Sequence, residues 1–170
     1  MHAVDVAESL SSMVILVDTR EQDTPRFRLR MQKIGVPYDR KKLDFGDYSA
    51  KFRLPCGDWF DLSAHVSVER KMNLDELCQC YTKGRARFER EFARAAYAGA
   101  KVYLMVEDGN WEKALSGDYR SHMAPKSLVA SMTAWLARYN CQLLFCAPET
   151  SGILLKELLF REGKERLCSL

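Results

Sequence analysis

Hydrophobic and polar residues follow each other along the chain in two periods, which predict alternating strands and helices. Continuous apolar runs at 13–17 and 102–106 are typical of strands buried on both faces. At 66–71 apolar residues alternate with polar ones, the period of a strand with one buried face. Shorter extended segments are predicted at 38–42, 48–54, 59–62 and 142–146.

Apolar residues three and four positions apart predict helices between these strands. Thr24 is a typical N-cap, Pro25 fits the first helical position, and Gly35 ends that helix. Asn73 followed by Glu76 resembles a capping box at the start of the next helix. The predicted helices span 25–34, 73–83, 85–97, 125–139 and a last stretch from Thr150 or Ser151 to about Gly163.

Two connections complete the predicted fold. Turn residues at 55–58 predict a hairpin within 48–62, which returns the chain to the place where it left. The polar segment 107–122 is predicted to be a partly helical, mobile surface excursion. We find no repeat, low-complexity tract or linker, so residues 1–170 are predicted to form one mixed α/β domain.

Composition and length are those of an ordinary globular protein. Of the 170 residues, 47% are hydrophobic and 29% are charged. No apolar run is long enough to span a bilayer, and the first residues lack the basic-then-apolar order of a signal peptide. We therefore expect an intracellular protein without membrane association, with its six cysteines reduced.

The distribution of charge is more informative than its sum. A net charge of +3 is too small to indicate a nucleic-acid-binding protein. Arginines nevertheless gather in two stretches, 20–30 and 85–94, which suits a polyanionic ligand. The alternative is that they are solvated helix faces, in particular Arg90 and Arg94, because acidic residues are nearby.

Two carboxylates and a lysine form the strongest candidate site. Period two places Glu69 and Lys71 on one face of the 66–71 strand, and Asp47 precedes the predicted hairpin. This set is typical of a metal-dependent nuclease, in which a hard divalent cation activates water and acts as a Lewis acid. Oxygen ligands without clustered His or Cys favour Mg²⁺ or Mn²⁺. The alternatives are a surface ion pair and a turn role for Asp47.

The pattern leaves several roles open. Lys71 is either a positive charge that supports the site or a general base, which requires a substantially lowered pKa. One metal ion and two are equally compatible with these residues. Asp75, an acid in the first turn of a predicted helix, is stabilised by the helix dipole even without a further function.

Four motifs resemble, in sequence order, those of the XPF-type nuclease domain, a branch of the PD-(D/E)XK superfamily. They are Val17-Asp18-x-Arg20-Glu21, Gly46-Asp47-Tyr48, Val68-Glu69-Arg70-Lys71-x-x-x-Asp75 and Gly84-Arg85. The resemblance covers about 13–106 with specific motifs, and the remainder only in its helix–strand–helix order. It implies a restriction-endonuclease-like fold, a mixed β-sheet flanked by α-helices, and cleavage of branched or flapped DNA with Mg²⁺ or Mn²⁺.

The resemblance also implies roles for single residues. Asp47 and Glu69 would hold the metal, and Lys71 would orient or help to deprotonate the attacking water. Asp18 and Glu21 resemble the additional acids of the family, with Asp18 also a candidate metal ligand. The remaining correspondences are Asp75 as the last acid of the motif and Arg20, Arg70 and Arg85 as phosphate-facing, DNA-binding residues.

We therefore expect a divalent-metal-dependent DNA endonuclease that acts on branched, flapped or single-strand-containing DNA in repair, recombination or replication. The alternatives are a non-catalytic DNA-binding or scaffold member of the same fold and a junction-resolvase-like PD-(D/E)XK nuclease. No helix-hairpin-helix module is expected within the chain, which favours a bacterial or phage-infected cytoplasm over a nucleus. The apolar segment 153–160 further suggests a homodimer formed through the last helix.

Overall fold

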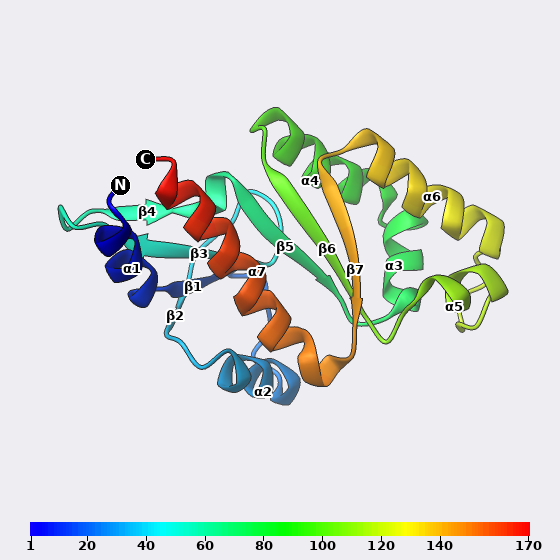
Figure 1. Cartoon of the computed structure of the whole chain (residues 1–170). Helices are drawn as coiled ribbons and strands as arrows, with labels where there is room; N and C mark the ends of the chain where they lie inside the picture. Colours follow the sequence, from blue (N-terminus) through cyan, green and yellow to red (C-terminus); the bar gives the residue numbers. More distant parts are fainter.

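The computed structural model describes residues 1–170 and contains one mixed β-sheet with helices on both faces (Figure 1). The seven strands have the spatial order β2-β1-β3-β5-β6-β7, and β4 pairs with β3 outside this path. Strands β5, β6 and β7 run parallel, whereas β3 is antiparallel to β1, β4 and β5. The strands are β1 (Val14–Val17), β2 (Tyr38–Arg40), β3 (Tyr48–Arg53), β4 (Trp59–Asp61), β5 (Val66–Lys71), β6 (Lys101–Glu107) and β7 (Cys141–Cys146).

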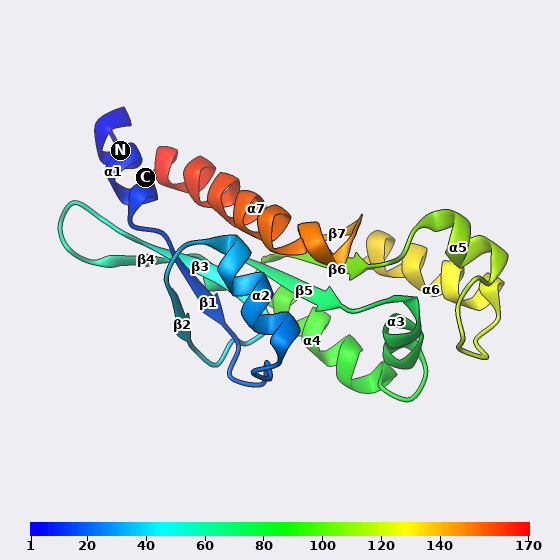
Figure 2. The same ribbon diagram turned by 90° about the horizontal axis from the view of Figure 1, so that it is seen from below.

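The helices divide between the two faces of the sheet. One hydrophobic cluster joins the sheet to α1 (Ala3–Ser11), α2 (Pro25–Ile34) and α7 (Pro148–Cys168). A second cluster joins it to α3 (Leu74–Tyr81), α4 (Arg85–Tyr97), α5 (Trp111–Ser116) and α6 (Pro125–Arg138). Figure 2 shows α7 on one side of the sheet and α3 and α4 on the other. The fold is therefore the α/β architecture expected from the sequence.

The strand β6 separates the two cores because its side chains point to opposite faces in turn. Tyr103 and Met105 belong to the core beneath α2 and α7, whereas Val102, Leu104 and Val106 belong to the core beneath α3, α4 and α6. The predicted strand buried on both faces is confirmed here. Strand β5, its parallel neighbour, is divided in the same way, and this division decides where the candidate site lies.

Two predicted helix starts are confirmed by their hydrogen bonds. The Thr24 hydroxyl accepts a hydrogen bond from the Phe27 N–H at 3.1 Å, with Pro25 at the first helical position. The Asn73 side chain accepts from the Glu76 N–H at 2.9 Å. Side-chain capping of these otherwise unpaired amide groups stabilises each helix start by about 1 kcal/mol.

The two ends of the chain differ from the prediction. Helix α1 is not among the predicted helices, but Val6 and Leu10, four positions apart, pack into the core. The last helix extends to Cys168, and Gly163 lies within it instead of ending it. A Cβ atom at Gly163 would lie 2.3 Å from Cζ of Phe52, so glycine is required for close helix–sheet packing, not for a helix end.

The structure bears on two further expectations. The apolar residues of the last helix are divided: Leu155 and Leu159 are fully buried in the chain's own core, whereas Ile153 is 54% exposed. The homodimer expected from this segment stays a prediction. Glu107 was expected to start a surface excursion, but it is the last residue of β6 and only 1% exposed. The rest of that segment is partly helical, as expected, because it contains α5.

None of the helices combines the length and the apolar composition that a membrane-spanning helix needs.

Candidate active site

The Gly46-Asp47 turn is bonded directly to the middle of β5. The Asp47 N–H donates to the Val68 carbonyl at 2.9 Å, and one carboxylate oxygen of Asp47 accepts from the Arg70 N–H at 2.8 Å. Gly46 has φ 74°, and a Cβ atom there would lie 2.5 Å from the Ser67 hydroxyl. Only glycine fits this position, which explains the Gly-Asp order of the motif.

Glu69 and Lys71 point together to the face covered by α3 and α4. The Lys71 ammonium donates to Oε1 of Glu69 at 2.5 Å, and both residues are buried. The ammonium also lies 5.2 Å from the ring centre of Phe88 on α4, within cation–π range. The second oxygen of Glu69, Oε2, is buried and has no hydrogen-bond partner. A buried carboxylate oxygen without a donor is costly unless a cation satisfies it.

The pKa values show that these charged groups perturb one another. Burial, and then repulsion from Glu69, raises the pKa of Asp47 well above its ordinary value. Burial also raises the pKa of Glu69, although Lys71 opposes the change. Burial alone would lower the pKa of Lys71, but attraction to Glu69 and Asp47 outweighs it and raises that pKa. Perturbed pKa values of this kind gather at functional sites.

The donor set fits a hard cation that keeps most of its water. No three His, Cys, Asp or Glu side chains are arranged to enclose a metal ion. Mg²⁺ is normally held by one or two carboxylates together with water and substrate oxygens, so Asp47 and Glu69 suffice. The unpartnered Oε2 of Glu69 supplies a free ligand atom.

Asp18 lies close to this site but both of its oxygens are occupied. One accepts from the backbone N–H and the guanidinium of Arg20, at 2.9 and 2.6 Å, and the other accepts from the Leu43 N–H at 2.8 Å. Burial would raise the pKa of Asp18, but these hydrogen bonds outweigh it and lower that pKa. Asp18 therefore joins the loops after β1 and β2 and orients Arg20, and its expected role as a metal ligand stays a prediction.

Arg70 and Glu21 lie on the opposite face of the sheet from Lys71. Arg70 donates to Glu107 at 3.2 Å, and Glu107 also pairs with Arg30 of α2 at 3.5 Å. Glu21 accepts from the Tyr48 hydroxyl at 2.6 Å, and this hydroxyl accepts from Arg30 at 2.9 Å. The side chain of Arg70 is only 16% exposed. Its position in this buried network differs from the expected phosphate-facing one because consecutive strand residues point to opposite faces.

Asp75 and Arg85 are also held by neighbours in the structure. One oxygen of Asp75 accepts from the N–H groups of Arg120 and Ser121, at 2.8 and 2.7 Å, so Asp75 anchors the loop after α5. Arg85 pairs with Glu89 at 3.2 Å and lies over the Trp135 ring at 5.4 Å. Asp75 also lines the groove described below, and the roles expected of Asp75 and Arg85 stay predictions.

A groove of about 1290 Å³ opens over Glu69 and Lys71. Its walls come from the α3–α4 junction, with Lys83 and Arg87, and from the loop that carries Arg120. The lining also contains Asp75 and Glu76 of α3, so the groove carries both acidic and basic side chains. This arrangement suits a polyanion whose phosphate lies above a bound cation.

Glu91 is a site residue that the sequence reasoning missed. Its carboxylate accepts from the Gly46 N–H at 2.9 Å and lies 3.8 Å from Arg20, and it lines the groove. Only 6% of Glu91 is exposed. The signal was present in the sequence: Glu91 lies three positions after Phe88 and next to Phe92, on the buried face of α4.

Fold, motif order and groove together define an XPF-type nuclease domain. A family model described as the ERCC4 domain matches residues 17–157, and the chain belongs to this family. Among solved structures, XPF from Aeropyrum pernix matches with a TM-score of 0.60 and 23% identity, over 92% of this chain. The match spans 62% of the length of that XPF chain. No curated protein sequence matches significantly.

Proposed function

We propose that this protein is a divalent-metal-dependent endonuclease that hydrolyses phosphodiester bonds in DNA. The observation that carries the proposal is the unpartnered Oε2 of Glu69, in a buried site that also contains Asp47 and Lys71. Glu69 and Lys71 face a groove whose lining includes Lys83, Arg87 and Arg120. Membership of the ERCC4 domain family supports the same class of activity.

Asp47 and Glu69 are the proposed ligands of Mg²⁺ or Mn²⁺. A bound ion would lower the pKa of its water and polarise the phosphoryl oxygen. The chain's own residues prepare the site: the Arg70 N–H fixes the orientation of the Asp47 carboxylate, and Glu91 holds the Gly46 backbone beside it. Asp18 and Arg20 have a positioning role in this proposal, since both oxygens of Asp18 accept hydrogen bonds from the protein.

Lys71 is proposed to stay protonated and to stabilise negative charge on the phosphate. Its ammonium is held 2.5 Å from the carboxylate of Glu69, which fixes the position of the positive charge at the groove floor. A preorganised charge of this kind lowers the barrier without reorganisation during the reaction. Arg87 and Lys83, on the groove wall, are proposed to bind the flanking phosphates.

The proposed substrate is branched, flapped or otherwise single-strand-containing DNA. The test is incubation of the purified protein with labelled flap, fork, single-stranded and blunt duplex DNA, with Mg²⁺ or with EDTA. We expect Mg²⁺-dependent cuts in the substrates that contain unpaired strands. Binding without cutting would favour a scaffold member of the fold, and paired nicks in four-way junctions would favour a resolvase.

Two variants test the assigned residues separately. Lys71→Ala should lower the cleavage rate by about 10²- to 10³-fold, the usual effect of removing one electrostatic contact to a transition state, and leave DNA binding largely intact. Glu69→Gln should abolish the binding of Mn²⁺, which is measured by electron paramagnetic resonance. Lys126→Ala, an exposed lysine on α6, is the matched control and should change neither property.

A further inference from the structure

One face of α4 carries three arginines and a tyrosine in a continuous row. Arg87, Arg90, Arg94 and Tyr97 are spaced by three, four and three positions, which places them on the same side of an α-helix. All four side chains are exposed, and Tyr97 is 98% exposed. We name this row the α4 stripe.

The positive charge of the α4 stripe is not neutralised by the protein. Glu89 pairs with Arg85 and Arg138, at 3.2 and 3.7 Å, and Glu91 points inward to the Gly46 N–H. The acidic residues that accompany the stripe in sequence are therefore occupied elsewhere. None of the three stripe arginines has a carboxylate within the 4.0 Å limit of an ion pair.

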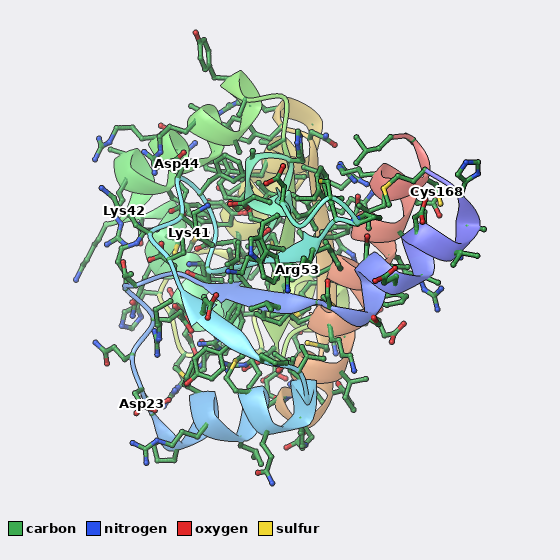
Figure 3. All side chains as sticks on the ribbon, turned by 90° about the vertical axis from the view of Figure 1, so that its left-hand side faces the viewer. Asp23, Lys41, Lys42, Asp44, Arg53 and Cys168 are labelled. Atoms are coloured by element: carbon green, nitrogen blue, oxygen red, sulfur yellow. The ribbon has the colours of Figure 1, made fainter.

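The α4 stripe begins at the catalytic groove and leads away from it. Arg87 lines the groove above Glu69, whereas Arg90, Arg94 and Tyr97 line a second hollow of about 470 Å³ beside Asp44. Figure 3 shows Asp44 next to α4, and the Arg94 guanidinium donates to the Asp44 carbonyl at 2.8 Å. Ten helical residues separate the two ends, a length of about 15 Å.

We propose that the α4 stripe binds an unpaired DNA strand that enters the catalytic groove. The arginines contact successive phosphates, and one base stacks on the Tyr97 ring. A fully exposed ring at the end of a basic row favours a single strand over a duplex, because the faces of paired bases are covered by their neighbours. The direction of the strand toward Lys71 rests on the proposed nuclease function.

The test measures binding without cleavage. Fluorescence anisotropy of a labelled oligothymidylate of about 16 nucleotides, within the range of single-strand site sizes, is recorded in EDTA. Tyr97→Ala should weaken binding by about 5- to 150-fold, and Tyr97→Phe should retain it. Arg90→Gln should weaken binding and reduce the slope of log K against log salt by about 0.7.

Arg26→Gln is the matched control for charge. Arg26 is exposed and lies on α2, which packs on the other face of the sheet, so its loss should leave affinity and salt slope unchanged. The proposal would be overturned if Tyr97→Ala bound the oligothymidylate as tightly as wild type, or if it weakened the binding of blunt duplex DNA by the same factor. It would also be overturned if Arg26→Gln weakened binding as much as Arg90→Gln.

The same variants separate this inference from the nuclease function. One outcome is that the wild-type protein cuts no DNA with Mg²⁺ while Tyr97→Ala still weakens binding of the oligothymidylate. This outcome would support the α4 stripe as a DNA-binding surface and refute the proposed endonuclease activity. The opposite outcome is that the wild-type protein cuts DNA and Tyr97→Ala binds the oligothymidylate as tightly as wild type. This outcome would support the endonuclease activity and refute the proposed role of the α4 stripe.

Discussion

Glu69 and Arg70 are adjacent in sequence, but their side chains form ion pairs on opposite faces of the same sheet. Glu69 pairs with Lys71 beneath α4, and Arg70 pairs with Glu107 beneath α2. The backbone N–H of Arg70 meanwhile donates to Asp47. One short strand segment therefore holds the floor of the candidate site on one face and a buried ion cluster on the other.

Removal of Glu107 should destabilise the fold strongly. Glu107 is the carboxylate between two largely buried guanidinium groups, Arg30 and Arg70, so Glu107→Ala leaves two uncompensated positive charges. We expect a loss of about 3–5 kcal/mol in the free energy of unfolding, measured by urea titration at pH 7. Glu157→Ala, which breaks an exposed pair with Arg161, is the control and should cost less than about 1 kcal/mol. Equal losses for the two variants would contradict this account.

Glu91 should affect catalysis through the backbone that it holds. Glu91→Ala leaves the buried Gly46 N–H without its acceptor, at a cost of about 1–3 kcal/mol, and loosens the turn that positions Asp47. The cleavage rate kcat should fall while KM changes little. Glu91→Gln keeps an acceptor oxygen and should restore most of the rate. If Glu91 acted on the DNA only through its negative charge, both variants would give the same result, because both remove that charge.

Hydrophobic period and capping residues are sufficient to predict most of the elements. Thr24, Pro25 and Gly35 determine the ends of α2 through their own backbone and capping preferences, so its bounds can be predicted from residues at the ends themselves. The pairing of Gly46-Asp47 with β5 was anticipated from the hairpin, which returns the chain to its starting point. Where the cause is local, the sequence is informative.

The failures have tertiary causes. Gly163 was predicted to end a helix. A glycine is required there because a Cβ atom would collide with the Phe52 ring, more than a hundred positions away in sequence. Asp18 and Asp75 accept hydrogen bonds from the N–H groups of distant loops, at Leu43 and Arg120, which the spacing of the motif does not predict. Spacing gives the face on which a side chain lies, whereas its partner depends on the packing of elements far apart in sequence.

Gly163→Ala should be destabilising although alanine is the better helix former. Helix propensity alone would favour the change by about 1 kcal/mol. The added Cβ atom would lie 2.3 Å from Cζ of Phe52, a fully buried ring. Overpacking costs about 1–3 kcal/mol, so a net loss of stability is expected in thermal unfolding. The double variant Gly163→Ala, Phe52→Leu should recover part of it, and a stabilised single variant would show that the ring moves aside.

The pH dependence of stability should contain a contribution from Glu162 on α7. Its carboxylate accepts from Lys101 at 2.6 Å and from the Tyr103 hydroxyl at 2.5 Å, and it pairs with Arg166. Burial would raise the pKa of Glu162, but these hydrogen bonds outweigh it and lower the pKa below the ordinary value of 4.5. A lowered folded-state pKa means that the contribution is complete above pH 4.5 and is lost as the pH falls through the folded-state value.

The variant Glu162→Gln isolates this contribution from the other carboxylates. Asp47 and Glu69 have raised pKa values and act in the opposite direction, so the wild-type profile alone is a sum of opposing effects. The difference in unfolding free energy between wild type and Glu162→Gln, measured by urea titration from neutral to acidic pH, removes those shared contributions. This difference should be constant above about pH 5 and shrink below it, because wild type alone takes up the extra proton on unfolding. A difference that stays constant down to pH 3 would show that the folded-state pKa of Glu162 is not lowered, and a difference that grows as the pH falls would show that it is raised.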